Sequence, residues 1–114
     1  MIRRSILGAA VLALVTGAAG AARAQCDTTF TLENRSGIQI NELYFSSSRD
    51  SDWGNDRLGQ NVLAAGASVR YQPRPGGAYD FRVVFANGRA VERRNVDLCS
   101  VSTVTVTAQG ISAQ

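Results

Sequence analysis

The stretch that decides the fold is Tyr79-Asp80-Phe81-Arg82-Val83-Val84-Phe85, followed by Ala86-Asn87-Gly88. Its odd-numbered residues are all apolar and give one strongly hydrophobic face, a period of two that is typical of a half-buried β-strand. Asn-Gly tolerates the positive φ angles of a tight hairpin turn. The sequence therefore predicts a β-hairpin whose return strand covers residues 89–97.

The register of this hairpin depends on the length of its turn. A two-residue turn at Asn87-Gly88 would place Glu92 and Arg94 on the apolar face of the first strand, which is unfavourable for a core. We therefore expect a three-residue or bulged turn, which would pair Phe85 with Val91.

Shorter strand patterns lie on both sides of the hairpin, over residues 28–33, 38–45, 68–72 and 101–108. The apolar residues of the second pattern change parity, which predicts a bulge near Asn41-Glu42. Residues 58–64 fit either a strand or a helical turn. Many short strands without a convincing helix predict an all-β domain, a small antiparallel β-sandwich of six to eight strands, with a small β-barrel as the alternative.

The N-terminus has the three parts of an export signal. Arg3-Arg4 precedes an uncharged apolar run over residues 6–15, and Ala22-Arg23-Ala24 offers small residues for signal peptidase. We expect a cleavable signal peptide over residues 1–24, a single domain over residues 25–114, and a periplasmic or secreted product. The apolar run is shorter than the roughly 20 residues of a membrane span, so no span is expected after cleavage. Both the general and the twin-arginine export routes stay open.

Removal of the signal would change the charge of the protein. The whole chain has a formal net charge of +3 and no histidine. Three of its arginines lie within residues 1–24, which leaves nine arginines against nine acidic residues in the rest of the chain. A neutral domain gives no reason to expect nucleic acid as a partner.

The two cysteines, Cys26 and Cys99, lie near the two ends of the expected domain. An even number of cysteines in an oxidising compartment predicts a structural disulfide. In the chain-entropy treatment, such a bridge would stabilise the domain by roughly 4 kcal/mol. A zinc site is not expected, because no histidine is present to complete its ligands.

The composition also argues against catalysis. Without histidine or lysine, the chain has no imidazole base and no amine nucleophile. It has neither a glycine-rich phosphate loop nor a Gly-x-Ser-x-Gly element. We predict that the protein is not an enzyme, and the sequence assigns no catalytic or cofactor-binding residue.

The most distinctive segment is the loop of residues 46–57. Four oxygen-bearing side chains lie close together in it, and they are Asp50, Asp52, Asn55 and Asp56. Calcium takes six to eight oxygen ligands, so these residues are candidates for part of a calcium site. In the alternative interpretation, the acids bind backbone amides of the loop or pair with Arg49 and Arg57.

Trp53 and Arg57 are the candidate binding residues of the same loop. An exposed tryptophan can stack on a sugar or anchor a partner protein. A tryptophan in a long loop more often plugs the open end of a sandwich, and we favour that interpretation.

A set of motifs resembles a group of small exported bacterial proteins. The most specific motif is Trp53-Gly54-x-Asp56-x-Leu58-Gly59, and Tyr79-Asp80-Phe81-Arg82 and Val96-Asp97-Leu98-Cys99 accompany it. The resemblance covers nearly all of the chain after the signal. It implies no established activity, and members carry labels such as twin-arginine signal protein or argininosuccinate lyase. That lyase is a much longer helical enzyme, so the label would not describe this chain.

The same group often has a second cysteine where this chain has Ala78, which leaves the pairing of Cys26 with Cys99 open. We expect a non-catalytic exported protein that acts by binding a protein or glycan of the cell envelope through residues 46–57. The alternatives are an inhibitor of an envelope hydrolase and a calcium-dependent binding module.

Overall fold

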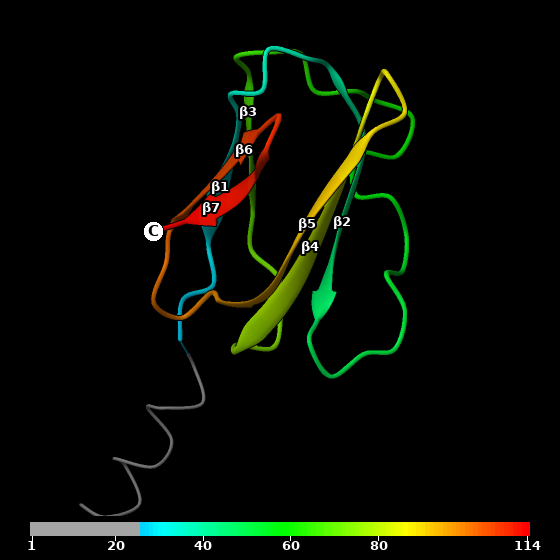
Figure 1. The fold of residues 1–114 in the computed structure, drawn as a ribbon. Coiled ribbons are helices and arrows are strands. Elements are labelled where there is room, and N and C mark those ends of the chain that lie inside the picture. Colours follow the sequence, from blue (N-terminus) through cyan, green and yellow to red (C-terminus); the bar gives the residue numbers. More distant parts are fainter. Residues whose placement is uncertain (1–25) are drawn as a thin grey trace, which may run out of the picture.

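The structure, a computed structural model, describes residues 26–114, so the predicted signal peptide lies outside the described residues. The described chain forms two facing sheets and no helix (Figure 1). The strands are β1 (Phe30–Asn34), β2 (Ile40–Ser47), β3 (Ser68–Tyr71), β4 (Ala78–Phe85), β5 (Ala90–Asp97), β6 (Thr103–Thr107) and β7 (Gly110–Ala113). No helix among these residues is long and apolar enough to cross a membrane.

The two sheets confirm the predicted small β-sandwich. One sheet has the order β3-β1-β6-β7 and the other has the order β2-β4-β5, and neither closes into a barrel within the described residues. One detail of the prediction is wrong, because the sandwich is not wholly antiparallel. β1 pairs with β6 in parallel, with Leu32 opposite Val104. This pairing joins segments far apart in the chain, which strand patterns alone do not specify.

The core lies between the sheets and follows the alternation seen in the sequence. Phe81, Val83 and Phe85 of β4 are buried, as the period of two predicts. Phe30 of β1 and Phe45 of β2 meet edge to face across the core, with ring centroids 5.3 Å apart. Such aromatic pairs contribute about 0.5–1.5 kcal/mol beyond the area that they bury.

The central hairpin has the expected three-residue turn. The Phe85 N–H donates to the Arg89 carbonyl at 2.8 Å, and the Gly88 N–H donates to the Phe85 carbonyl at 2.9 Å. The predicted pairing of Phe85 with Val91 is wrong, since Val91 lies opposite Val83. A β-bulge at Arg94-Asn95 then shifts the register of β5 and returns Val96 to the core side.

The expected bulge in β2 is present, because the register shifts between Ile40 and Glu42. The residues after β2 then run back along its free edge before they cross to β3 (Figure 1). Ile40 and Leu63 exchange two backbone hydrogen bonds of 2.9 Å. Residues 58–64 are therefore neither a strand nor a helical turn but a turn followed by a single bridge. This cover protects an edge that could otherwise pair with another chain.

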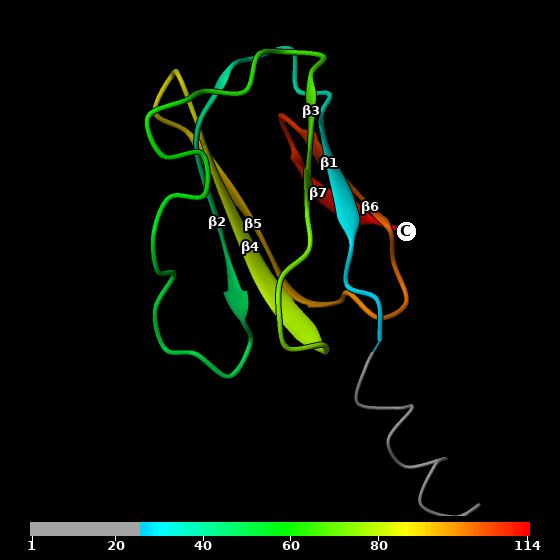
Figure 2. The same cartoon turned by 180° about the vertical axis from the view of Figure 1, so that it is seen from behind.

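The last strand, β7, was not expected as a separate element. It turns back from β6 and lies next to β5 of the other sheet (Figure 2). Arg93 of β5 donates to the Ile111 carbonyl at 3.3 Å across this junction. The two sheets therefore contact each other directly on this side, while residues 48–67 cover the opposite side.

The Cys26–Cys99 disulfide is formed, with 5.4 Å between the two Cα atoms. It connects the segment before β1 to the segment before β6, as predicted from the cysteine spacing. The bridge lies against Gly76, which precedes the start of β4 at Ala78 by two residues.

Candidate functional site

The loop of residues 46–57 begins in the last two residues of β2 and covers the outer face of the β2-β4-β5 sheet. This face carries the even-numbered residues of β4, since the odd-numbered ones point into the core. Asp80 belongs to it and is nevertheless buried, with only 10% of its side chain exposed. Its burial beneath the loop marks the place where the loop is anchored.

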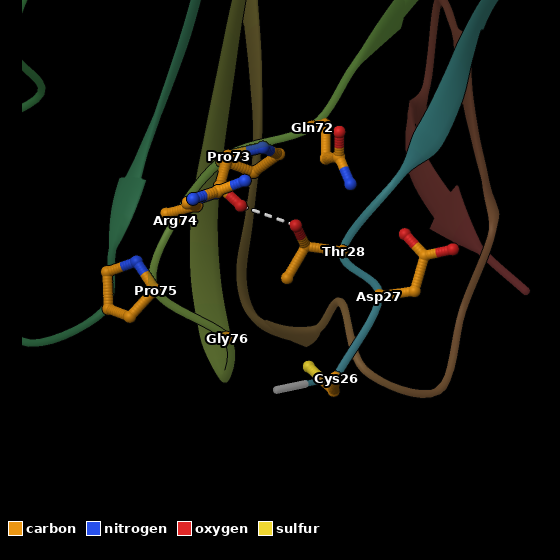
Figure 3. Close-up of a pocket in the computed structure, with 8 residues that line it drawn as sticks. All are labelled: Cys26, Asp27, Thr28, Gln72, Pro73, Arg74, Pro75 and Gly76. Atoms are coloured by element: carbon orange, nitrogen blue, oxygen red, sulfur yellow. Dashed lines mark hydrogen bonds between the residues drawn. The ribbon is translucent and has the colours of Figure 1, made fainter. Parts of the chain in front are cut away.

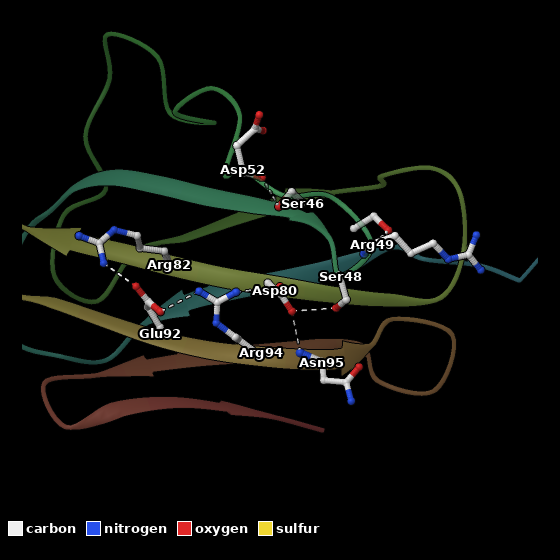
Figure 4. Close-up of polar contacts among 10 residues, drawn as sticks. Ser46, Ser48, Arg49, Asp52, Asp80, Arg82, Glu92, Arg94 and Asn95 are labelled. Atoms are coloured by element: carbon white, nitrogen blue, oxygen red, sulfur yellow. Dashed lines mark hydrogen bonds and ion pairs between the residues drawn. The ribbon is translucent and has the colours of Figure 1, made fainter.

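Asp80 joins three separate elements of this face (Figure 4). Its Oδ1 atom accepts hydrogen bonds from the Ser48 hydroxyl at 2.7 Å and from the Asn95 N–H at 2.9 Å. Its Oδ2 atom forms an ion pair of 3.2 Å with Arg94. The Asp80 carboxylate of β4 thus holds the loop and β5 in place.

The local backbone explains why β5 offers this N–H group. Arg94 and Asn95 together lie opposite Asp80, which makes a β-bulge, and Asn95 has a φ of 64°. A bulge leaves one residue outside the regular ladder of hydrogen bonds. The Asp80 carboxylate accepts the N–H that the ladder leaves free.

Electrostatics keep Asp80 ionised. Burial alone would raise the pKa of Asp80, but the hydrogen bonds from Asn95 and Ser48 and the charge of Arg94 outweigh it, so the pKa lies below its ordinary value. Arg94 also contacts Glu92 at 3.4 Å, and Glu92 pairs with Arg82 at 2.6 Å. The outer face is therefore an ion-pair network that surrounds one buried carboxylate.

Trp53 lies on this network and not in the core. The Arg94 guanidinium carbon is 4.9 Å from the centroid of the Trp53 ring, a cation–π contact. Trp53 is half-buried and does not belong to the hydrophobic cluster between the sheets. The interpretation of Trp53 as a plug for the open end of the sandwich is therefore wrong.

The four predicted calcium ligands do not gather in one place. Asp50 and Asp52 line a small hollow of about 50 Å³ beside Asp80, Trp53 and Arg94. Asn55 and Asp56 do not line it, and Asn55 is exposed. Within residues 26–114, no group of three or more carboxylates and thiolates is placed to hold a metal ion. Calcium binding by the remaining acids stays a prediction.

Asp56 points inward, where it binds backbone amides. Its Oδ1 atom accepts from the Leu43 N–H at 2.9 Å and from the Leu58 N–H at 3.0 Å. This is the alternative that the sequence offered, in which a loop acid binds backbone amides. Gly54 and Gly59 both have positive φ, and Leu58 is buried. The Trp-Gly-x-Asp-x-Leu-Gly motif thus fixes the loop against β2.

We predict that Asp56→Ala lowers the free energy of unfolding by about 2 kcal/mol, because it leaves two backbone N–H groups without their acceptor. Urea unfolding measures the change, which we expect to be the same with calcium and with a chelator. Asp52→Ala is the control, since its exposed carboxylate has no hydrogen-bond partner among the described residues and its loss should change stability by less than about 0.5 kcal/mol. Equal destabilisation by the two variants would contradict the assignment.

Arg57 covers the end of the core that we expected Trp53 to cover. Its guanidinium carbon lies 4.2 Å from the centroid of the buried Phe45 ring, and its Nη2 atom donates to the Phe45 carbonyl at 2.7 Å. Arg57 also lines a hollow of about 360 Å³ between the loop and the segment of residues 73–75. The remaining residues that line it are Ser46, Ser47, Arg49, Asp50 and Tyr79.

A third hollow, of about 730 Å³, lies beside the disulfide (Figure 3). Cys26, Thr28 and residues 72–76 contribute to its lining. The Thr28 hydroxyl donates to the Pro73 carbonyl, and the Tyr79 hydroxyl donates to the Pro75 carbonyl at 2.6 Å. These bonds hold the 72–76 segment from two sides, and Arg74 lines both this hollow and the hollow of about 360 Å³.

Sequence reasoning missed Asp80 as an anchor and Arg74 as a surface residue of this end. The prolines on either side of Arg74 indicate a stiff segment, but nothing in the sequence shows that this segment lies next to residues 46–57. No protein-family model, no curated protein and no solved structure matches this chain.

Proposed function

We propose that this protein is a non-catalytic, exported β-sandwich that acts by binding, with the loop of residues 46–57 as its contact surface. The observation that carries the proposal is the anchoring of this loop. Asp80 and Asp56 hold it from beneath, while most of its remaining side chains are exposed. A loop that is ordered before binding loses little conformational entropy when a partner binds.

Several features support the rest of the proposal. The chain has no histidine or lysine, and its most buried carboxylate is engaged by three donors of the fold. The Cys26–Cys99 bridge supports a final location in an oxidising compartment, the periplasm or the exterior. The partner would then be a protein or glycan of the cell envelope.

A second candidate function is inhibition of an envelope hydrolase. The same observation favours it, since protease–inhibitor complexes bind tightly when the contact surface is pre-formed. A hydrolase that the loop inhibits should lose its activity at a stoichiometric amount of the protein.

The test is affinity capture from envelope extract with the immobilised protein and a loop variant. Ser51, Asp52 and Asn55 are exposed and make no side-chain hydrogen bond within residues 26–114, so the triple alanine variant should fold normally. We expect this variant to capture at least tenfold less partner than the unchanged protein, because the contact surface changes while Asp80 and Asp56 still anchor the loop.

The matched control replaces Ser102, Gln109 and Ser112, three exposed residues of the other sheet and its loops, by alanine. It should capture as much partner as the unchanged protein. Equal capture by the loop variant would contradict the proposal. Parallel captures with calcium and with a chelator test whether the protein is a calcium-dependent binding module. In that case the partner should no longer be captured in the presence of the chelator.

A further inference from the structure

The hollow between residues 46–57 and 73–75 has an unusual charge for this protein. Three arginines line it, Arg49, Arg57 and Arg74, against one acid, Asp50. The whole of residues 26–114 carries nine arginines and nine acidic residues. A neutral domain thus has a local excess of positive charge at one end of the sandwich.

The nine arginines of residues 26–114 fall into two groups: three form ion pairs, and six, including Arg70 of β3 and Arg93 of β5, form none. Arg35, Arg82 and Arg94 each pair with a carboxylate of the fold. No carboxylate oxygen of residues 26–114 lies within 4.0 Å of a guanidinium nitrogen of Arg49, Arg57 or Arg74. Their N–H groups are therefore available to a ligand from outside.

Arg57 is held in position before any ligand arrives. Its guanidinium lies over the Phe45 ring, and a single hydrogen bond, to the Phe45 carbonyl, fixes its orientation. Stacking on an aromatic ring leaves the edges of the guanidinium plane, which carry its N–H groups, open. Most of its five N–H donors stay free for a ligand.

Arg74 is presented by a segment whose neighbours on either side are tied to the fold. The Pro73 carbonyl accepts a hydrogen bond from the Thr28 hydroxyl (Figure 3). The Pro75 carbonyl accepts a hydrogen bond from the Tyr79 hydroxyl. On the opposite wall, Ser48 bonds through its backbone N–H to the Ala78 carbonyl at 2.9 Å and through its hydroxyl to Asp80. This holds the backbone next to Arg49. Both walls of the hollow are thus fixed by hydrogen bonds.

We propose that this hollow binds a phosphate monoester group, an inference that rests on the proposed binding function and names its ligand class. Three guanidinium groups and one carboxylate give a net charge of +2, which matches a phosphate monoester of charge about −1.5 to −2 at pH 7. Guanidinium forks suit the oxygens of a phosphate, and three forks can serve three oxygens. A volume of about 360 Å³ accommodates the phosphate and part of the group that it esterifies.

The test measures binding of glucose 6-phosphate by calorimetry at about 0.15 M salt, with acetate as the comparison anion. We expect a dissociation constant for the phosphate ester below about 1 mM and much weaker binding of acetate. Arg49→Gln and Arg74→Gln should each weaken phosphate binding at least tenfold. Neither the Arg49 nor the Arg74 side chain makes a hydrogen bond within residues 26–114, so both of these variants should fold. They keep the test decisive if Arg57→Gln, which loses the bond to the Phe45 carbonyl, does not fold.

Arg89→Gln is the matched control. Arg89 is also exposed and also lacks an ion-pair partner among the described residues, but it follows the hairpin turn at the other end of the sandwich (Figure 1). Its loss should change the affinity less than twofold. An equal loss of phosphate affinity in Arg89→Gln would show that overall charge causes the binding and would overturn the proposal. Undetectable phosphate binding, or equal affinity for acetate and the phosphate ester, would also overturn it.

Vesicles of phosphatidylcholine with and without phosphatidic acid separate the two sources of the group. Binding to phosphatidic acid vesicles that needs Arg74 indicates a lipid headgroup, whereas binding of glucose 6-phosphate alone indicates a soluble ester or glycan. If neither probe binds but the protein still captures an envelope partner that the alanine variant at residues 51, 52 and 55 does not capture, the proposed ligand class is wrong. The proposed binding function is then still supported.

The pH dependence gives an independent readout. The second pKa of a phosphate monoester is about 6, and the ligand loses charge below it. The protein groups that face the hollow are Arg49, Asp50, Arg57, Arg74 and Tyr79, and the chain has no histidine. Affinity should therefore fall as the pH drops from 7 to 5, and an affinity that is constant over this range would count against a phosphate ligand.

Discussion

Gly76→Ala should lower the free energy of unfolding by about 3–4 kcal/mol, nearly as much as removal of the disulfide itself. A Cβ atom at this position would lie 2.5 Å from the Cys26 sulfur and 3.1 Å from the Cys99 sulfur. Both sulfurs belong to one covalent bridge, so neither can move aside as the end of a flexible side chain could. The variant must shift the 72–77 segment or leave the bridge open.

Two measurements separate the steric effect from a general loss of stability. Alkylation without reductant shows which of the two outcomes occurs: free thiols are labelled in Gly76→Ala if the bridge stays open, and none are labelled if the segment shifts or in the unchanged protein. In a background that carries Cys26→Ala and Cys99→Ala, the glycine substitution should have little effect in urea unfolding, because the sulfurs that it would meet are gone. An equal loss of stability in both backgrounds would contradict the argument.

Gly110→Ala is the control for glycine replacement as such. Gly110 lacks a positive φ, and a Cβ atom there would have no neighbour within 4 Å. We expect it to change the stability by less than about 1 kcal/mol. The difference in stability between Gly76→Ala and Gly110→Ala reports the steric clash with the disulfide. It does not report the loss of the conformational freedom of glycine, which both substitutions share.

Local periodicity was sufficient to predict much of the fold. The alternation of β4, the three-residue turn at Asn87 and the bulge in β2 are properties of a few neighbouring residues, and the sequence carries them directly. The predicted partner of Val91 was wrong, because a three-residue turn pairs Phe85 with Arg89 and so places Val91 opposite Val83. The bulge at Arg94-Asn95 changes the register only beyond this point, where Val96 returns to the core side. A bulge that is stabilised by a side chain on another strand leaves no local signal.

Long-range pairing was out of reach for the same reason. The parallel contact of β1 with β6 and the short strand β7 depend on which segments meet in three dimensions. The candidate site shows the same limit. The acids of the loop were visible, but whether Asp56 faces solvent or backbone amides depends on β2 beneath it. Arg74 is a candidate because its segment lies beside the loop in three dimensions, which the sequence does not show.

Asp80→Ala is the second substitution for which we expect a large effect, a loss of about 3 kcal/mol. It would leave the Asn95 N–H and the Ser48 hydroxyl without their acceptor and Arg94 without its buried partner. Glu92→Ala is the control, since Glu92 pairs with the same arginine but is more exposed, and its loss should cost less than about 1 kcal/mol. The emission of Trp53 should shift in Asp80→Ala, because Trp53 lies against Arg94.

The pH dependence of stability identifies the charge of Asp80 as the cause. Its pKa is lower in the folded protein than the ordinary value near 3.9, so ionisation stabilises the fold above that pH and ceases to do so as the pH falls through the lower folded pKa. The free energies of unfolding of the unchanged protein and of Asp80→Asn in urea should therefore differ most between pH 5 and 7, and the difference should shrink as the pH falls below the ordinary pKa of the carboxyl group. The asparagine keeps the shape of the side chain and one acceptor oxygen, so this convergence reports the carboxylate charge alone. A difference that stays constant down to pH 2.5 would show that shape, and not charge, holds the loop to β4 and β5.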